Sequence, residues 1–127
     1  MTTGVLVDTS VWVVHFRVHN HALTNLLEND LVLVHPLIIG EIACGTPPAR
    51  SQTLSALNGL KGMQEASIRE VLNFIELERL YGLGCGFVDL LLLASTLMTP
   101  GGALWTLDKR LGTLAERFGV MHQPRLH

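Results

Sequence analysis

The sequence is poor in charged residues and has no excess of basic ones. Lys, Arg, Asp and Glu make up 16% of the 127 residues, and the formal net charge at pH 7 is −2. Because a typical globular domain is about one-quarter charged, part of this surface must be apolar, which suggests that an oligomer or a partner covers it. The lack of a basic excess excludes binding to nucleic acid through bulk electrostatics, so any contact with RNA or DNA must form at a local site.

Cysteine is also scarce, and no hydrophobic run is long enough to cross a membrane. Cys44 and Cys85 are too few and too far apart for a disulfide framework or a CxxC site, and we interpret both as reduced thiols in the core. The longest apolar run, 87–98, is interrupted by Asp89 and is shorter than the roughly 20 residues of a membrane span. The first residues lead into an apolar run at 4–7 without the pattern of a signal peptide. We therefore expect a soluble, cytoplasmic protein with no membrane contact.

Short apolar segments alternate with helical segments along the whole chain. Strands predicted at 4–7, 31–34 and 103–107 lack the polar alternation of half-exposed strands, which indicates burial on both faces. Buried strands that alternate with helices predict a mainly parallel sheet covered on both faces, an α/β/α sandwich built by right-handed crossovers. The length fits one domain over 1–127. The helices are expected at 11–17, 19–29, 36–44, 47–60, 67–82, 87–98 and 109–118, with a short last strand at 120–122.

Four acidic residues stand where the chain is otherwise apolar. Asp8 and Asp108 follow the first and third predicted strands, and in parallel sheets ligands bind beyond these carboxyl ends. Both have a simpler explanation as helix N-caps, each worth about 1 kcal/mol, and the helix dipole favours Asp89 in a first turn. Glu41 is the hardest to explain in this way, because it interrupts an apolar helix and no Lys or Arg lies within a helical turn of it.

Taken together, the four carboxylates predict a metal site at one edge of the sheet. Carboxylates about 4 Å apart repel one another by a few kcal/mol, so they either share protons or bind a hard cation. Oxygen ligands favour Mg²⁺ or Mn²⁺ over zinc, and no His or Cys set with zinc spacing competes. Such a site suits phosphodiester hydrolysis, since the cation polarises the phosphoryl oxygens.

In their order and separation, the segments around these acids resemble a PIN-domain nuclease. The length is similar to that of a VapC-type toxin from a toxin–antitoxin pair, and the resemblance covers the whole chain. No single motif is specific, but the ordered set of four is. The segments are Val7-Asp8-Thr9-Ser10-Val11-Trp12, Glu41-Ile42, Gly86-Phe87-Val88-Asp89-Leu90-Leu91-Leu92-Leu93-Ala94 and Thr106-Leu107-Asp108.

The resemblance implies a fold, an activity and partners. The fold is an α/β/α sandwich on a mainly parallel sheet, and the activity is a Mg²⁺- or Mn²⁺-dependent endoribonuclease. Asp8, Glu41, Asp89 and Asp108 would hold the metal, and Asp89 or Asp108 would position the attacking water. A homodimer, a structured RNA or mRNA substrate and a cognate VapB-type antitoxin that blocks the site are implied as well.

Four further residues are candidates beside the acids. Ser10 and Thr106 match positions at which the family has a hydroxyl that hydrogen-bonds to the acidic cluster. Lys109 and Arg110 follow Asp108 directly and are the preferred pair for contacts with RNA phosphates, although solvated surface charge is the more common role of such residues. No further acid follows Asp108 closely, so a second metal ion is not implied.

Other functions remain open at this point. The same fold with a vestigial acidic pocket would serve as a non-catalytic module that binds RNA or protein, although the sequence shows no lost acid. Phosphoryl transfer onto Asp8 is disfavoured, because no second aspartate follows two residues later. No histidine has the context of a catalytic triad. Trp12 and Trp105 lie beside buried strands and are expected in the core rather than stacked on bases.

Overall fold

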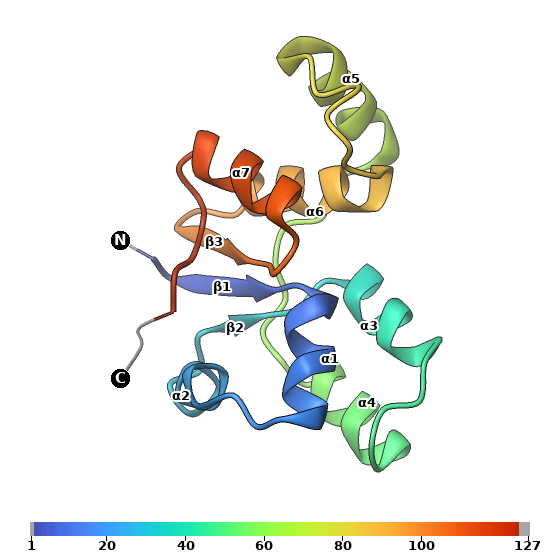
Figure 1. The fold of residues 1–127 in the computed structure, drawn as a ribbon, viewed down its shortest axis with the longest axis vertical. Helices are drawn as coiled ribbons and strands as arrows, with labels where there is room; N and C mark the ends of the chain where they lie inside the picture. The colour runs from blue at the N-terminus through green and yellow to red at the C-terminus, as the bar shows by residue number, and fades with distance from the viewer. Residues whose placement is uncertain (1, 125–127) are drawn as a thin grey trace.

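The computed structural model of the chain describes residues 2–124, which are built around a three-stranded parallel sheet (Figure 1). The strand order is β2-β1-β3, and Leu6 of the central strand pairs with Leu33 on one side and Leu104 on the other. All of β1 is buried, as its unbroken apolar run predicts. The strands are β1 (Gly4–Val7), β2 (Val32–Leu33) and β3 (Gly102–Trp105).

Seven helices are formed within the described residues, and they divide between two sides of the sheet. In Figure 1, α5, α6 and α7 gather beyond β3, whereas α1 to α4 lie on the side of β1 and β2. The parallel sheet with its helices confirms the predicted α/β class. The helices are α1 (Thr9–Arg17), α2 (His21–Glu28), α3 (Pro36–Ala43), α4 (Arg50–Asn58), α5 (Ile68–Glu78), α6 (Phe87–Met98) and α7 (Lys109–Arg117).

Helix α6 runs through the core and packs against β3, α5 and α7. Every residue from Leu90 to Thr96 is buried, because this helix is apolar around its whole circumference. The buried hydroxyls of Ser95 and Thr96 each donate to the backbone carbonyl four residues earlier, so they leave no unpaired polar group.

Trp12 and Trp105 are 5% and 4% exposed, which confirms their predicted place in the core. No helix among residues 2–124 has the length and apolar character of a membrane span.

Several predicted boundaries are wrong. Helix α4 begins at Arg50 instead of residue 47, because Ala49 adopts a left-handed conformation with φ of 45° and stops the helix from starting earlier. Helix α5 ends at Glu78, since Arg79 is also left-handed with φ of 55°. The strand expected at 120–122 is reduced to a single parallel bridge between Leu104 and Met121.

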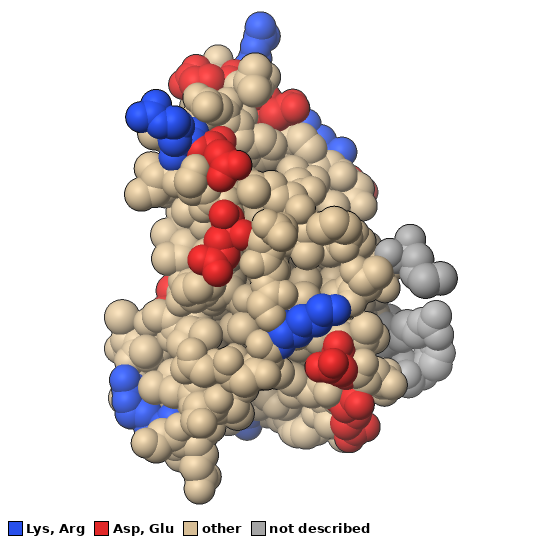
Figure 2. Space-filling view, turned by 180° about the vertical axis from the view of Figure 1, so that it is seen from behind, with Lys and Arg blue, Asp and Glu red and all other residues tan. Residues whose placement is uncertain are grey.

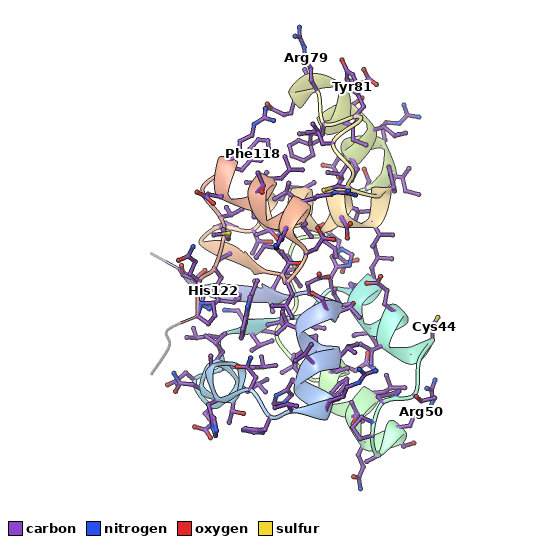
Figure 3. All side chains as sticks on the ribbon, viewed as in Figure 1. Cys44, Arg50, Arg79, Tyr81, Phe118 and His122 are labelled. Carbon is purple, nitrogen blue, oxygen red and sulfur yellow. The ribbon has the colours of Figure 1, made fainter. Side chains whose placement is uncertain are left out.

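The prediction that both cysteines are core thiols is also wrong. Cys44 is the C-terminal cap of α3 and is exposed, and Cys85 is only partly buried in the loop before α6. Figure 3 shows Cys44 at the outer end of α3, pointing away from the molecule. Both thiols are free, as predicted, but an apolar sequence neighbourhood does not bury a residue that ends a surface helix.

Candidate active site

Asp8 occupies the end of the central strand and is held by three hydrogen bonds. Asp8 is only 7% exposed to solvent. Oδ1 accepts from the Thr9 backbone N–H at 2.9 Å, while Oδ2 accepts from Ser10 Oγ at 3.0 Å and Thr106 Oγ1 at 2.7 Å. A buried carboxylate is costly unless it is hydrogen-bonded, and these donors from α1 and from the end of β3 fix its position.

The same two hydroxyls extend the network to the start of α7. Ser10 Oγ accepts from the Leu107 backbone N–H at 3.1 Å, and Thr106 Oγ1 accepts from the Asp108 N–H, also at 3.1 Å. A hydroxyl can donate once and accept as well, so each side chain joins Asp8 to the segment that carries Asp108. Ser10 and Thr106 therefore make contacts of the kind that the family resemblance implies for them.

Glu41 lies on α3 and is joined to the start of α1. Thr9 Oγ1 donates to Glu41 Oε1 at 2.8 Å, which places Glu41 on the same side of the molecule as the adjacent Asp8. The one side-chain ion pair within the described residues joins Arg117 and Glu78 at 3.7 Å. The carboxylate of Glu41 is therefore not stabilised by an ion pair. Thr9 was not singled out from the sequence, although its position in the Asp8-Thr9-Ser10 motif was a signal.

Asp89 stands in the first turn of α6 and feels the charge of the other three acids. Burial raises its pKa most, and the negative charges of Asp8, Asp108 and Glu41 raise the pKa further, while a hydrogen bond from the Gly86 backbone lowers it. Three carboxylates that act on a fourth must share one region. Together with the hydrogen bonds around Asp8, this places the four predicted acids in one region near the carboxyl end of β1.

Asp108 is the N-cap of α7, and its Oδ1 accepts from the Leu111 N–H at 2.9 Å. Asp8 is likewise the N-cap of α1. The simple capping interpretation of both residues is therefore confirmed. Since both also belong to the acidic cluster, capping and clustering are not alternatives here.

The donor set fits a hard divalent cation in chemistry, because all of its side-chain ligands are carboxylate oxygens. Burial and the repulsion by the other acids raise the pKa of Asp89, and such an ion would relieve the repulsion. In their present positions, no three acidic, histidine or cysteine side chains within residues 2–124 are grouped closely enough to hold a metal ion. Glu41 and Asp108 are exposed, whereas Asp8 is buried.

Two further features lie beside the acids. Lys109 and Arg110 are both exposed in the first turn of α7, and Arg110 Nη1 lies 3.5 Å from the Gly84 carbonyl oxygen. A groove of about 410 Å³ starts at Glu41 and runs between α1 and the α3–α4 connection. Its lining is mostly apolar, with Arg17 as its cation: Val13, Phe16, Arg17, Glu41, Ile42, Gly45, Thr46, Pro47 and Pro48.

Comparison with known proteins gives the class of this site. No protein-family model matches the chain. Two curated relatives are each 40% identical to it over 116 residues, which cover 91% of this chain and 94% of the relative. The chain therefore belongs to the VapC family of ribonucleases. Both relatives are named Ribonuclease VapC32 and come from two strains of Mycobacterium tuberculosis.

Proposed function

We propose that the chain is a Mg²⁺- or Mn²⁺-dependent endoribonuclease whose metal is held by Asp8, Glu41, Asp89 and Asp108. The observation that carries this proposal is the hydrogen-bonded cluster at the end of β1, in which Thr9, Ser10 and Thr106 hold two of the acids. Burial raises the pKa of Asp89, and the charges of the other three acids raise it further. No ion pair joins any of the four acids to a lysine or arginine among the described residues. Membership of the VapC family supports the ribonuclease class, and the all-oxygen donor set supports the choice of metal.

The acidic residues would have different roles in this reaction. A bound cation would supply polarisation of the phosphoryl oxygens. Asp8, fixed by its three donors, would be the rigid ligand. Asp89 or Asp108, at the starts of α6 and α7, would orient the attacking water.

We propose a cognate VapB-type antitoxin as the partner that neutralises the site. The groove between α1 and the α3–α4 connection supports this, since it starts at Glu41 and is lined mainly by apolar groups. A peptide laid in it would reach the acidic cluster directly. Val13 lies on the wall of this groove and is 41% exposed. Val13→Asp is expected to weaken antitoxin binding, measured by calorimetry, and to leave RNA cleavage intact. Unchanged binding would refute this placement of the antitoxin.

We also propose a homodimer formed through α5. This helix projects from the body (Figure 1) and exposes Ile68, Leu72 and Leu77 by 66%, 52% and 81%. Tyr81 lies beyond the outer end of the helix (Figure 3) and is 60% exposed. On the face shown in Figure 2, charged residues are scattered between wide uncharged areas. Leu77→Ser is expected to yield a monomer in light scattering, and a retained dimer would exclude α5.

The test compares Asp8→Asn with Asp30→Asn. Asp30 has φ of 56° in an exposed turn, a conformation that Asn tolerates, so the second variant is a matched control for the loss of one negative charge. With Mn²⁺ and total RNA, Asp8→Asn is expected to lose cleavage while Asp30→Asn keeps it. Circular dichroism would confirm that both are folded.

If a clean preparation of folded Asp8→Asn cleaved RNA at the wild-type rate, the proposal would be contradicted. Absence of any cleavage by the wild-type chain, together with absence of stabilisation by Mn²⁺, would favour the alternative of a non-catalytic module that binds RNA or protein.

A further inference from the structure

Arg110 lies across the loop that precedes α6 and fills the space above Gly84. A Cβ atom built on Gly84 would lie 2.7 Å from Arg110 Cδ, 2.8 Å from Nη1 and 2.9 Å from Nε. A side chain at position 84 would therefore displace the flexible side chain of Arg110 from this place. We call this contact the Gly84 notch.

Each side of the notch is close in sequence to one of the four acids. Gly84 has φ of 89°, a left-handed conformation that favours glycine, and the loop continues directly into the helix that carries Asp89. Arg110 is two residues after Asp108, the cap of α7. The arginine thus spans the starts of α6 and α7, which carry two of the four acids.

The charge of Arg110 reaches the acidic cluster without being neutralised there. Burial and the charges of Asp89 and Asp108 raise the pKa of the Cys85 thiol, whereas Arg110 lowers it, so all three charges act on the residue next to Gly84. Arg110 forms no ion pair with a carboxylate in the described part of the chain. Its exposed guanidinium is therefore accessible to an incoming anion.

Two other basic side chains, Arg50 and Lys109, differ from it in this respect. Arg50 donates to the carbonyls of Ala43 and Gly45 at 2.7 and 2.9 Å, at the end of α3. Lys109 makes no side-chain hydrogen bond or ion pair within 2–124, so nothing holds its ammonium near the acids. A polyanion that approaches four carboxylates needs a cation fixed beside them, and the planar guanidinium suits two phosphate oxygens at once.

We propose that Arg110, seated in the Gly84 notch, binds a phosphate of the RNA backbone beside the scissile phosphate, and that position 84 must be glycine for the guanidinium to reach it. This inference rests on the proposed endoribonuclease function and assigns its substrate-phosphate contact. Arg110 then acts as a binding residue, and Gly84 as the residue that positions it. Lys109 contributes only diffuse charge.

The first experiment compares Gly84→Ala with Gly82→Ala. Both glycines have positive φ, 89° and 74°, so alanine strains the backbone similarly at each. A Cβ on Gly82 would meet nothing within 4 Å, whereas on Gly84 it displaces Arg110. Gly84→Ala is expected to raise KM for RNA by about ten- to a hundredfold with little change in kcat, which is the range for losing a hydrogen bond to a charged group. Gly82→Ala is expected to stay near wild type.

The second experiment does not depend on the folding of the Gly84 variant. RNA binding is measured by anisotropy in the inactive Asp8→Asn background, comparing Arg110→Gln with Lys109→Gln, two adjacent changes that remove the same charge. Arg110→Gln is expected to flatten the dependence of log K on log salt by about 0.7, the value for one phosphate contact with a single strand. Combining Arg110→Gln with Gly84→Ala is expected to add little, because both remove the same contact.

Equal behaviour of Gly84→Ala and Gly82→Ala, or of Arg110→Gln and Lys109→Gln, would overturn the inference. If these pairs are equal while wild-type cleavage still depends on Asp8, the phosphate contact is wrong and the endoribonuclease proposal stands. If wild type neither binds nor cleaves RNA, both fail together.

Discussion

Thr9 Oγ1 and Glu41 Oε1 lie 2.8 Å apart although 32 positions separate the two residues in the chain. This contact fixes the acid of α3 next to the start of α1, where Asp8 ends the central strand. Glu41 had no cation partner in the sequence, and a hydroxyl from another helix is what holds it. The gathering of the four acids therefore depends on tertiary contacts made by uncharged neighbours.

Removing that hydroxyl is expected to reduce cleavage without unfolding the protein. Thr9→Val keeps the shape of the side chain but leaves Glu41 unheld, and a net hydrogen bond of about 1 kcal/mol corresponds to a loss of roughly five- to tenfold in kcat/KM. Thr9→Ser keeps the hydroxyl and is the control. Equal cleavage rates of the two variants in the same RNA assay would show that the contact does not position Glu41.

Thr106 is expected to contribute to stability through the buried carboxylate of Asp8. Thr106→Val removes the 2.7 Å donor to Asp8 and leaves the Asp108 N–H without its acceptor. A hydrogen bond to a charged group is worth about 1.5–3 kcal/mol, so the free energy of unfolding in urea should fall by that order without metal. Thr106→Ser should restore most of it, and a similar loss in both variants would assign the effect to packing instead.

His35 makes the stability of the fold depend on pH. It is 3% exposed, its Nδ1 accepts from the Leu37 N–H at the start of α3, and burial lowers its pKa while the charge of Glu65 raises it. Below the ordinary histidine pKa of 6.5 the unfolded chain takes up a proton that the folded ring resists. The free energy of unfolding should thus decrease as pH falls below 6.5.

His35→Asn tests this dependence, because asparagine caps a helix without titrating in this range. Urea unfolding at pH 7.5 and 5.5 is expected to show a smaller difference between the two pH values for the variant than for wild type. A difference of the same size would mean that other groups cause the pH dependence.

The sequence predicted the parts of the molecule that local chemistry determines. Unbroken apolar runs indicated the buried parallel strands, and Asp8 and Asp108 were recognisable both as caps and as residues at strand ends. Contacts between distant segments had no such local signal. The hydrogen bond from Thr9 to Glu41 and the notch at Gly84 depend on how helices are placed relative to one another.

Backbone conformation explains most of the remaining differences. Ala49 and Arg79 adopt left-handed conformations, although neither residue type favours them, so the bounds of α4 and α5 did not follow from propensity. The same limit applies to Cys44, whose exposure is set by the end of α3 at the surface. The metal-binding role of the four acids stays a prediction.

The central claim is that these acids form one cation site, and thermal unfolding of wild type and Asp89→Asn with EDTA or with Mn²⁺ tests it most directly. Because burial and the charges of the other acids raise the pKa of Asp89, its ionised form is disfavoured in the metal-free fold, and the neutral variant should melt at a higher temperature in EDTA. Mn²⁺ at about 100 times its Kd should stabilise wild type by roughly 2.7 kcal/mol and the variant far less. A wild-type protein that gains no stability from Mn²⁺, with a variant that melts lower in EDTA, would contradict the account.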